Sequence, residues 1–240
     1  MAEPPGRSSP SLGCMSDALA DLSDVVNFVL GEEQRTCVDL LGYSWGTARS
    51  ASFYEKAQGR VRQLALYAPV WRPLAGEPLA DIRDPTDPTS INAALGGYSK
   101  LSANQLKSLW DWEIDSGDWQ DYREPEALKA AEKALLESDP TWPWEELGFR
   151  APNGPKLDAL KVQLGECLFD AGKIDCEVML VRGAQDKLSS EKDANDLFGA
   201  IGSLRKRHVT IGLGTHLLHL EHNRMTLVNE LVSFFQTPSL

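Results

Sequence analysis

The chain has 240 residues, of which 42% are hydrophobic and 25% are charged, and this length fits one large domain or one domain with a sizeable insertion. Its formal net charge of −11 excludes nucleic acid as an expected partner, because phosphate binding needs clustered lysine and arginine. The sequence has neither an apolar run of bilayer length nor the basic start and apolar centre of a signal peptide. We therefore expect a cytoplasmic protein with no membrane partner.

The four cysteines show neither the C-x-x-C spacing of a zinc site nor the pattern of a disulfide framework. No other cluster of metal-ligating residues stands out in the sequence. We predict no metal site, and no motif in the chain implies a cofactor.

The first part of the chain predicts a strand–helix–strand unit after one helix. Residues 1–15 are rich in proline, glycine and serine and indicate an irregular segment. Apolar residues at helical spacing then predict a helix over 16–30. A strand over 37–41, a helix over 46–58 and a strand over 63–69 follow. This spacing is typical of a parallel crossover.

The stretch 71–172 has a different character. It is punctuated by prolines and holds six of the seven tryptophans. The predicted helices within it cover 90–95, 102–116, 125–137 and 155–169. We interpret it as a helical cap inserted into an α/β core that comprises 16–70 and 173–240. Most of the tryptophans are expected to pack the cap's own core, while one or two supply apolar contact to a substrate.

Regular alternation resumes after residue 172. The pattern predicts a strand over 177–183, a helix over 191–201, a strand over 208–211 and an amphipathic helix over 220–235. Together with the two earlier strands, these elements predict an α/β fold with a parallel sheet of about four strands.

The motif Gly42-Tyr43-Ser44-Trp45-Gly46 lies between the first predicted strand and its helix. G-x-S-x-G in this context is typical of a nucleophile elbow, whose glycines remove Cβ atoms that would clash where strand and helix pass closely. The helix N-terminus behind Ser44 also places backbone N–H groups where an oxyanion would form. The alternative is an ordinary glycine-rich turn, so the interpretation depends on partners elsewhere in the chain.

Two partners follow later strands. Asp186 comes just after the strand over 177–183, and His216 lies in a glycine-flanked loop after the last strand. Because parallel strands end at one edge of the sheet, Ser44, Asp186 and His216 are expected to meet there. Alone, Asp186 could cap a helix and His216 could be incidental. The order Ser…Asp…His favours a catalytic triad, and the preceding glycines favour His216 over its only rival, His219.

On these residues, the chain resembles serine hydrolases of the α/β-hydrolase fold over 16–70 and 173–236. The resemblance rests on the elbow motif, on Gly183-Ala184-Gln185-Asp186 and on Gly214-Thr215-His216. It implies that Ser44 is the nucleophile, that His216 is the general base and that Asp186 orients the imidazole.

The resemblance further implies that the backbone N–H of Trp45 is one oxyanion donor. Tyr43, Trp71 and Trp110 are the residues that we expect to bind substrate. The elbow is also similar to that of proline iminopeptidases, although Tyr43 stands where that group usually has glycine.

The family normally places several strands before the elbow strand, whereas only about 35 residues precede it here. The resemblance therefore implies that the chain corresponds to the C-terminal part of a hydrolase. Its elbow strand would form an exposed sheet edge, which favours association into a homo-oligomer. The upstream loop that normally supplies the second oxyanion donor is not recognisable, so we expect weak or no activity from the chain by itself.

Three functions follow from these observations. The first is a serine hydrolase that cleaves a small, largely apolar ester or amide through an acyl-enzyme. The second is an aminopeptidase similar to proline iminopeptidases, which needs a carboxylate for the substrate amine, with Glu113, Asp115 and Glu145 as candidates. The third is an inactive, truncated hydrolase that persists as an interaction module.

Overall fold

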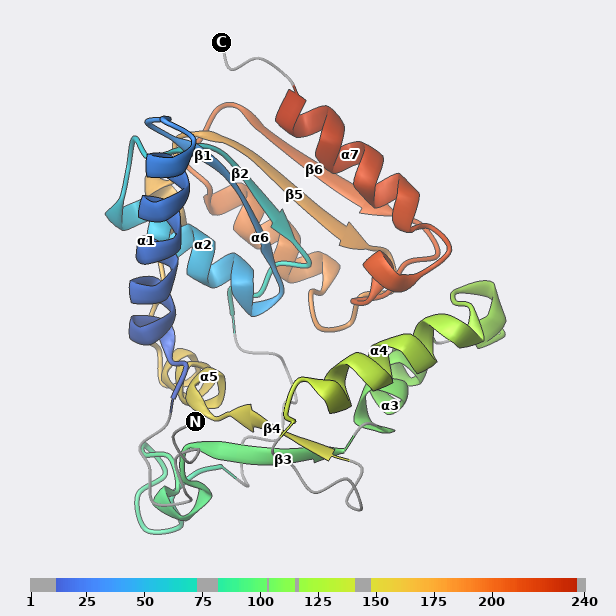
Figure 1. Ribbon diagram of the computed structural model, residues 1–240. Coiled ribbons are helices and arrows are strands. Elements are labelled where there is room, and N and C mark those ends of the chain that lie inside the picture. The colour runs from blue at the N-terminus through green and yellow to red at the C-terminus, as the bar shows by residue number, and fades with distance from the viewer. Residues whose placement is uncertain (1–11, 73–81, 103, 115–116, 141–147, 237–240) are drawn as a thin grey trace.

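A four-stranded parallel sheet is the centre of the computed structural model, which describes residues 12–72, 82–102, 104–114, 117–140 and 148–236 (Figure 1). The strands are β1 (Val38–Tyr43), β2 (Val61–Tyr67), β5 (Glu177–Gly183) and β6 (Lys206–Ile211). They lie in the order β1-β2-β5-β6, and each neighbouring pair is parallel. The predicted α/β fold with a parallel sheet of about four strands is confirmed.

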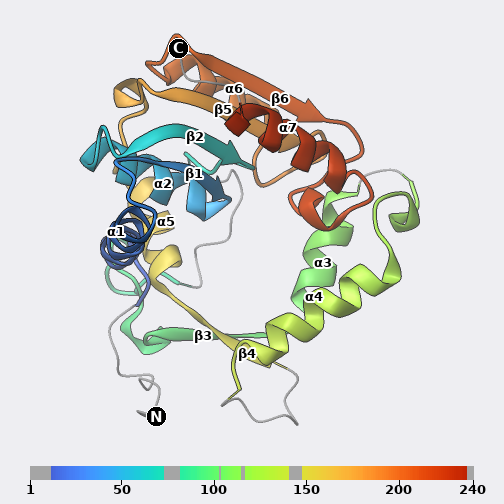
Figure 2. The same ribbon diagram turned by 45° about the horizontal axis from the view of Figure 1, so that its top comes forward.

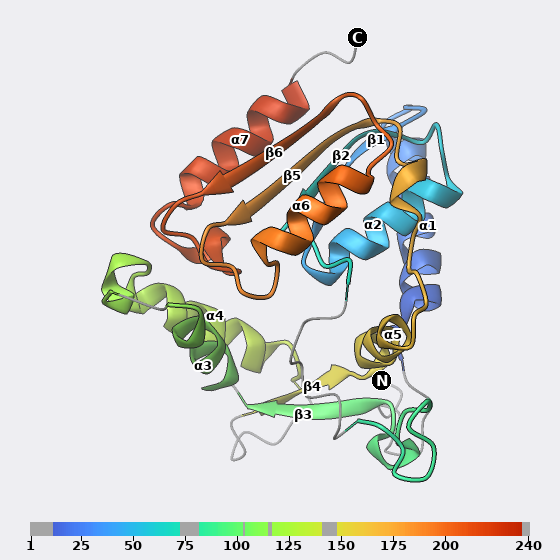
Figure 3. The same ribbon diagram turned by 180° about the vertical axis from the view of Figure 1, so that it is seen from behind.

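Helices cover both faces of this sheet (Figures 1 and 3). One face carries α1 (Met15–Glu32), α2 (Trp45–Lys56) and α6 (Glu191–Ala200), and the other carries α7 (Arg224–Gln236). Leu64 and Leu66 of β2 pack with the first group, whereas Ala65 and Tyr67 pack with α7. Successive strand side chains point to opposite faces, which is why a strand covered on both sides reads as a continuous apolar run.

The largest departures from the predicted helix bounds are the start of the closing helix and the end of the helix predicted over 155–169. The closing helix α7 begins at Arg224, because a 3₁₀ turn over Leu218–Leu220 and a turn over 221–223 precede it. The helix predicted over 155–169 is α5 (Gly154–Gln163). It stops early because Gly165 adopts a left-handed backbone with φ of 95°, the usual glycine termination of a helix.

Between β2 and β5, the described residues add no strand to the large sheet. They form α3 (Asn104–Glu113), α4 (Pro125–Glu137), α5 and a second, antiparallel sheet of β3 (Tyr98–Ser102) and β4 (Gly148–Pro152) (Figure 2). This second sheet was not predicted, and the helix expected over 90–95 is only a 3₁₀ turn over Ala93–Leu95. We call residues 71–172 the cap segment. The exact division into core and cap stays a prediction.

β1 is an outer strand, because within the described residues it pairs with β2 alone. Leu41 on this strand is 48% exposed. An outer strand with free backbone groups can pair with another chain, and association through this edge stays a prediction. Among the described helices, none has the length and apolar character needed to cross a membrane.

Candidate active site

Ser44 lies at the tight turn between β1 and α2, with a left-handed backbone of φ 53° and ψ −126°. Its N–H donates to the carbonyl of Tyr67, 3.0 Å away, which ties the turn to β2. A Cβ on Gly42 would lie 2.5 Å from the carbonyl oxygen of Gly46, so glycine is required there. A Cβ on Gly46 would meet nothing within 4 Å. The expected steric reason for the two glycines therefore holds for Gly42 and is wrong for Gly46.

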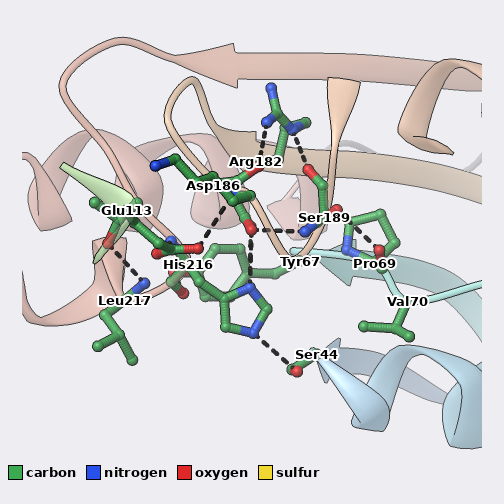
Figure 4. A network of polar contacts seen from close by, with 12 residues as sticks. Ser44, Tyr67, Pro69, Val70, Glu113, Arg182, Asp186, Ser189, His216 and Leu217 are labelled. Carbon is green, nitrogen blue, oxygen red and sulfur yellow. Dashed lines mark hydrogen bonds and ion pairs between the residues drawn. The ribbon is translucent and has the colours of Figure 1, made fainter. Parts of the chain in front are cut away.

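The three residues expected to form a triad lie together at the carboxyl ends of β1, β5 and β6 (Figure 4). The Nε2 atom of His216 lies 2.9 Å from Oγ of Ser44, and its Nδ1 atom lies 3.1 Å from each carboxylate oxygen of Asp186. His216 and Asp186 are buried, with 3% and 2% of their surface exposed. This arrangement suits an imidazole that donates from Nδ1 to Asp186 and accepts at Nε2 from the serine hydroxyl.

The loop that carries Asp186 is fixed by buried hydrogen bonds (Figure 4). The N–H of Ser189 donates to Oδ1 of Asp186 at 2.7 Å, and the Ser189 hydroxyl donates to the carbonyl of Pro69 at 2.8 Å. The guanidinium of Arg182 donates to the carbonyls of Ser189 and Asp186, at 2.7 and 2.8 Å. Burial lowers the pKa of Arg182. The acid loop is thereby held to the end of β2 as well as to β5.

The backbone of His216 is held on both sides. Its carbonyl accepts from the hydroxyls of Tyr43 and Tyr67, at 3.1 and 3.2 Å, and its N–H donates to the carboxylate of Glu113 at 2.7 Å. The Tyr43 ring also lies 5.2 Å from the His216 ring. Burial raises the pKa of both tyrosines, so they stay protonated donors. Tyr43, expected to bind substrate, therefore contacts the histidine directly.

Two further carboxylates, Glu113 and Glu221, are fully buried at the loop that carries His216, which we call the histidine loop. Oε1 of Glu113 accepts from the N–H of Lys187 at 3.0 Å, in addition to the bond with His216. Glu221 accepts from the indole N–H of Trp110 at 2.7 Å and from the N–H and hydroxyl of Thr215 at 3.0 and 2.6 Å. Burial raises the pKa of both glutamates. These contacts were not foreseen from the sequence.

The three tryptophans named from the sequence differ in their burial and in their distance along the chain from the triad. Trp110 is completely buried, with the guanidinium of Arg123 4.6 Å above its ring, and so it presents no surface to a ligand in this structure. Trp71 is half-buried against the core cluster of α1 and α2. Trp45 begins α2, where the first backbone N–H groups have no partner within the helix. Its N–H is therefore suited to bind an oxyanion.

His219, the rival histidine, contacts the tyrosines instead of the serine. Its Nδ1 atom lies 3.2 Å from the hydroxyl of Tyr67, and its ring lies 4.7 Å from that of Tyr43. Burial, with a smaller contribution from His216, lowers the pKa of His219 to about 4. It is therefore a neutral supporting group at neutral pH.

Comparison with solved structures identifies the fold. A structure reported with two metagenome-derived lipolytic enzymes, LipS and LipT, is 15% identical, with a TM-score of 0.58 over 92% of this chain and 73% of that chain. A thermophilic esterase from Thermogutta terrifontis is 15% identical, with a TM-score of 0.59 over 98% and 75% of the two chains. A serine hydrolase involved in carbazole degradation, CarC, is 14% identical, with a TM-score of 0.57 over 98% and 74%.

No protein-family model matches the sequence, and a search of curated proteins found no match either. At these low identities the structural likeness bears on the fold alone. The sheet order, the helices on both faces and these likenesses together show that the chain has the α/β-hydrolase fold.

Proposed function

We propose that this chain is a serine hydrolase that cleaves a small ester or amide through an acyl-enzyme intermediate. The observation that carries the proposal is the continuous hydrogen-bonded series from Ser44 through His216 to Asp186. All three side chains follow parallel strands and converge at one sheet edge, where open α/β folds bind their ligands. The strained backbone of Ser44 supports the same assignment, because such strain collects at functional sites.

In the proposed reaction, Nε2 of His216 takes the hydroxyl proton as Oγ of Ser44 attacks the substrate carbonyl carbon. The carbonyl oxygen becomes an oxyanion beside the N-terminus of α2, where the N–H of Trp45 can donate to it. His216 then gives the proton to the leaving alkoxide or amine as the carbon–heteroatom bond breaks. A water molecule, deprotonated by His216, hydrolyses the acyl-serine and restores the enzyme.

The contacts of Glu113 favour ester or amide hydrolysis over the aminopeptidase alternative. A carboxylate that recognises a substrate amine needs an oxygen that is open to the substrate. Glu113 is fully buried, and both of its oxygens accept backbone N–H groups. The other two candidates, Asp115 and Glu145, lie outside the described residues.

Labelling with a fluorophosphonate, which phosphonylates an activated serine, tests the proposal directly. In line with the weak activity expected from the sequence, the wild type should label slowly. Both Ser44→Ala and His216→Ala should lose at least about 10³-fold in labelling rate relative to it, since the triad acts as a unit. Ser138→Ala and His222→Ala are matched controls, because both residues are exposed, and they should label like the wild type. Folded wild-type protein that does not label would overturn the hydrolase proposal and favour an interaction module.

A further inference from the structure

We propose that Glu113, at the C-terminal end of α3, is a positioning residue that clamps the loops of Asp186 and His216 and makes alignment of the triad depend on the seating of the cap segment. This inference rests on the proposed function, because it concerns the same site. It assigns Glu113 no contact with substrate.

The geometry is that of one side chain bridging two loops (Figure 4). Oε2 of Glu113 accepts the N–H of His216 itself, and Oε1 accepts the N–H of Lys187, the residue directly after Asp186. These are the backbone groups next to the two side chains whose relative position decides whether the imidazole is aligned. Hydrogen bonds to an ionised acceptor are stronger than neutral ones, so the two loops are firmly joined.

The clamp on the N–H of His216 is matched by contacts on the carbonyl of the same residue. Tyr43 and Tyr67, which end strands β1 and β2, hold the carbonyl of His216. The base is therefore fixed between the sheet, which binds its carbonyl, and the cap segment, which binds its N–H. A shift of α3 would act on His216 directly.

Lys187 fixes the last turn of α3 to the acid loop a second time. Its ammonium group donates to the carbonyl of Trp112 at 2.6 Å and lies 5.0 Å from the centre of the Trp112 ring. The end of α3 and the residue after Asp186 are thus held to each other from both directions. This reciprocal contact makes α3 part of the support of the triad.

Burial of a carboxylate at this position costs free energy, which is unfavourable unless the charge and shape of the group are needed. Burial and the like charge of Asp186 both raise the pKa of Glu113, whereas the N–H bonds and His216 favour the ionised form. An apolar residue would serve simple packing of the helix at lower cost. Two oxygens that accept two converging N–H groups are a property of the carboxylate, since an amide of the same shape offers only one acceptor atom.

The test compares Glu113→Gln and Glu113→Asp with the wild type in steady-state hydrolysis of an activated ester. Gln keeps the shape but loses one acceptor, and Asp keeps the charge but loses the reach. For both variants we expect kcat to fall about tenfold to a hundredfold, in line with loss of a charged hydrogen bond. KM should stay within about twofold, because Glu113 is buried away from substrate. Active-site titration restricts the comparison to folded protein.

Glu124→Gln is the matched control. Glu124 is an exposed carboxylate that precedes α4 and lies 3.6 Å from Nδ1 of His222, at the same boundary between the cap segment and the histidine loop. The identical chemical change there should leave kcat and KM unchanged. A purely structural Glu113 would lower the melting temperature while the folded fraction kept its kcat, and that result would overturn the proposal.

If the variants do not fold, hydrogen–deuterium exchange on the wild type tests whether Glu113 holds the two N–H groups. The N–H groups of His216 and Lys187 should exchange slowly, and fast exchange of both would overturn the clamp. Failure of the two proposals is distinguishable. Wild-type protein that never labels at Ser44 removes the hydrolase function, whereas labelling with unchanged kcat in the Glu113 variants removes only the clamp.

Discussion

The two sides of His216 are built by different means. On the sheet side, backbone shape has a large part: there is a strained serine turn, and at Gly42 and Gly183 a Cβ would lie 2.5 and 2.2 Å from carbonyl oxygens. The loop of Asp186 is held in addition by the hydrogen bonds of Arg182 and Ser189. On the side of the cap segment, the contacts are buried charges and their donors. There Glu113 binds the N–H of His216, and Glu221 binds Trp110 and Thr215.

The difference indicates which changes each side tolerates. A contact made by backbone shape fails when atoms are added, because close-packed backbone has no room to yield. A contact made by buried charge fails when a partner is removed, because the remaining group is left without water or a hydrogen bond.

The elbow glycines provide the largest expected effect outside the triad and its clamp. Gly42→Ala adds a methyl group that meets the backbone of Gly46, so β1 and α2 must move apart. We expect the free energy of unfolding to fall by about 3 kcal/mol, with loss of labelling at Ser44. Gly46→Ala adds its methyl group to open space in the first turn of a helix, and stability should stay within about 0.5 kcal/mol. Chemical denaturation of both variants measures the contrast, and equal losses would contradict it.

The sheet side was predictable from the sequence because its signals are local. Ser44 directly follows β1, while Asp186 and His216 lie in the loops after β5 and β6, and parallel strands bring their carboxyl ends to one edge of the sheet. The G-x-S-x-G motif also specifies the backbone turn at Ser44. What the pattern did not reveal is that Gly46 lacks the close contact that Gly42 has.

The cap segment was less predictable because its contacts cross long stretches of chain. Glu113 is separated by 74 and 103 residues from the two N–H groups that it binds, and no spacing rule connects them. The carboxylate of Glu113 suggested recognition of a substrate amine, whereas in the structure it accepts hydrogen bonds from two backbone N–H groups. β3 and β4 pair across α3 and α4, so they are not neighbours in the sequence as the strands of a hairpin are. The sequence Tyr98-Ser99-Lys100-Leu101 does not show the regular apolar–polar alternation of a half-buried strand.

Trp110→Phe tests the charged side by removing a donor. The change leaves Oε1 of buried Glu221 with the Thr215 hydroxyl alone and also opens a small void. We expect a loss of about 2 kcal/mol in the free energy of unfolding, with KM unchanged because the ring has no exposed surface. Trp119→Phe, at a ring that is 37% exposed, is the control and should change stability little. A raised KM without loss of stability would restore the sequence-based expectation that Trp110 binds substrate.

The smallest expected effect is on the pH dependence of the free energy of unfolding. A fall in pH should lower this free energy through His219 and raise it through the two glutamates. On the sheet side, burial sets the pKa of His219 to about 4 in the folded protein, below its ordinary value of 6.5. The stabilising contribution of neutral His219 to the free energy of unfolding is therefore present above pH 6.5 and is lost as the pH falls toward 4. On the cap side, the pKa values of Glu113 and Glu221 are raised, which means that the folded protein holds their protons more tightly than the unfolded chain does. Their contribution to the free energy of unfolding therefore falls as the pH rises above 4.5.

Comparison of the wild type with His219→Gln isolates the histidine, because the two glutamates are present in both proteins. Between about pH 7 and about pH 5.5, the wild type should lose about 1 kcal/mol more in the free energy of unfolding than the variant does. Urea denaturation at the two pH values measures this difference. Parallel pH profiles would mean that His219 is not buried as a neutral group between Tyr43 and Tyr67. The sheet side would then be held by its backbone turns and by the hydrogen bonds of Tyr43 and Tyr67 to His216, without a contribution from a buried neutral His219.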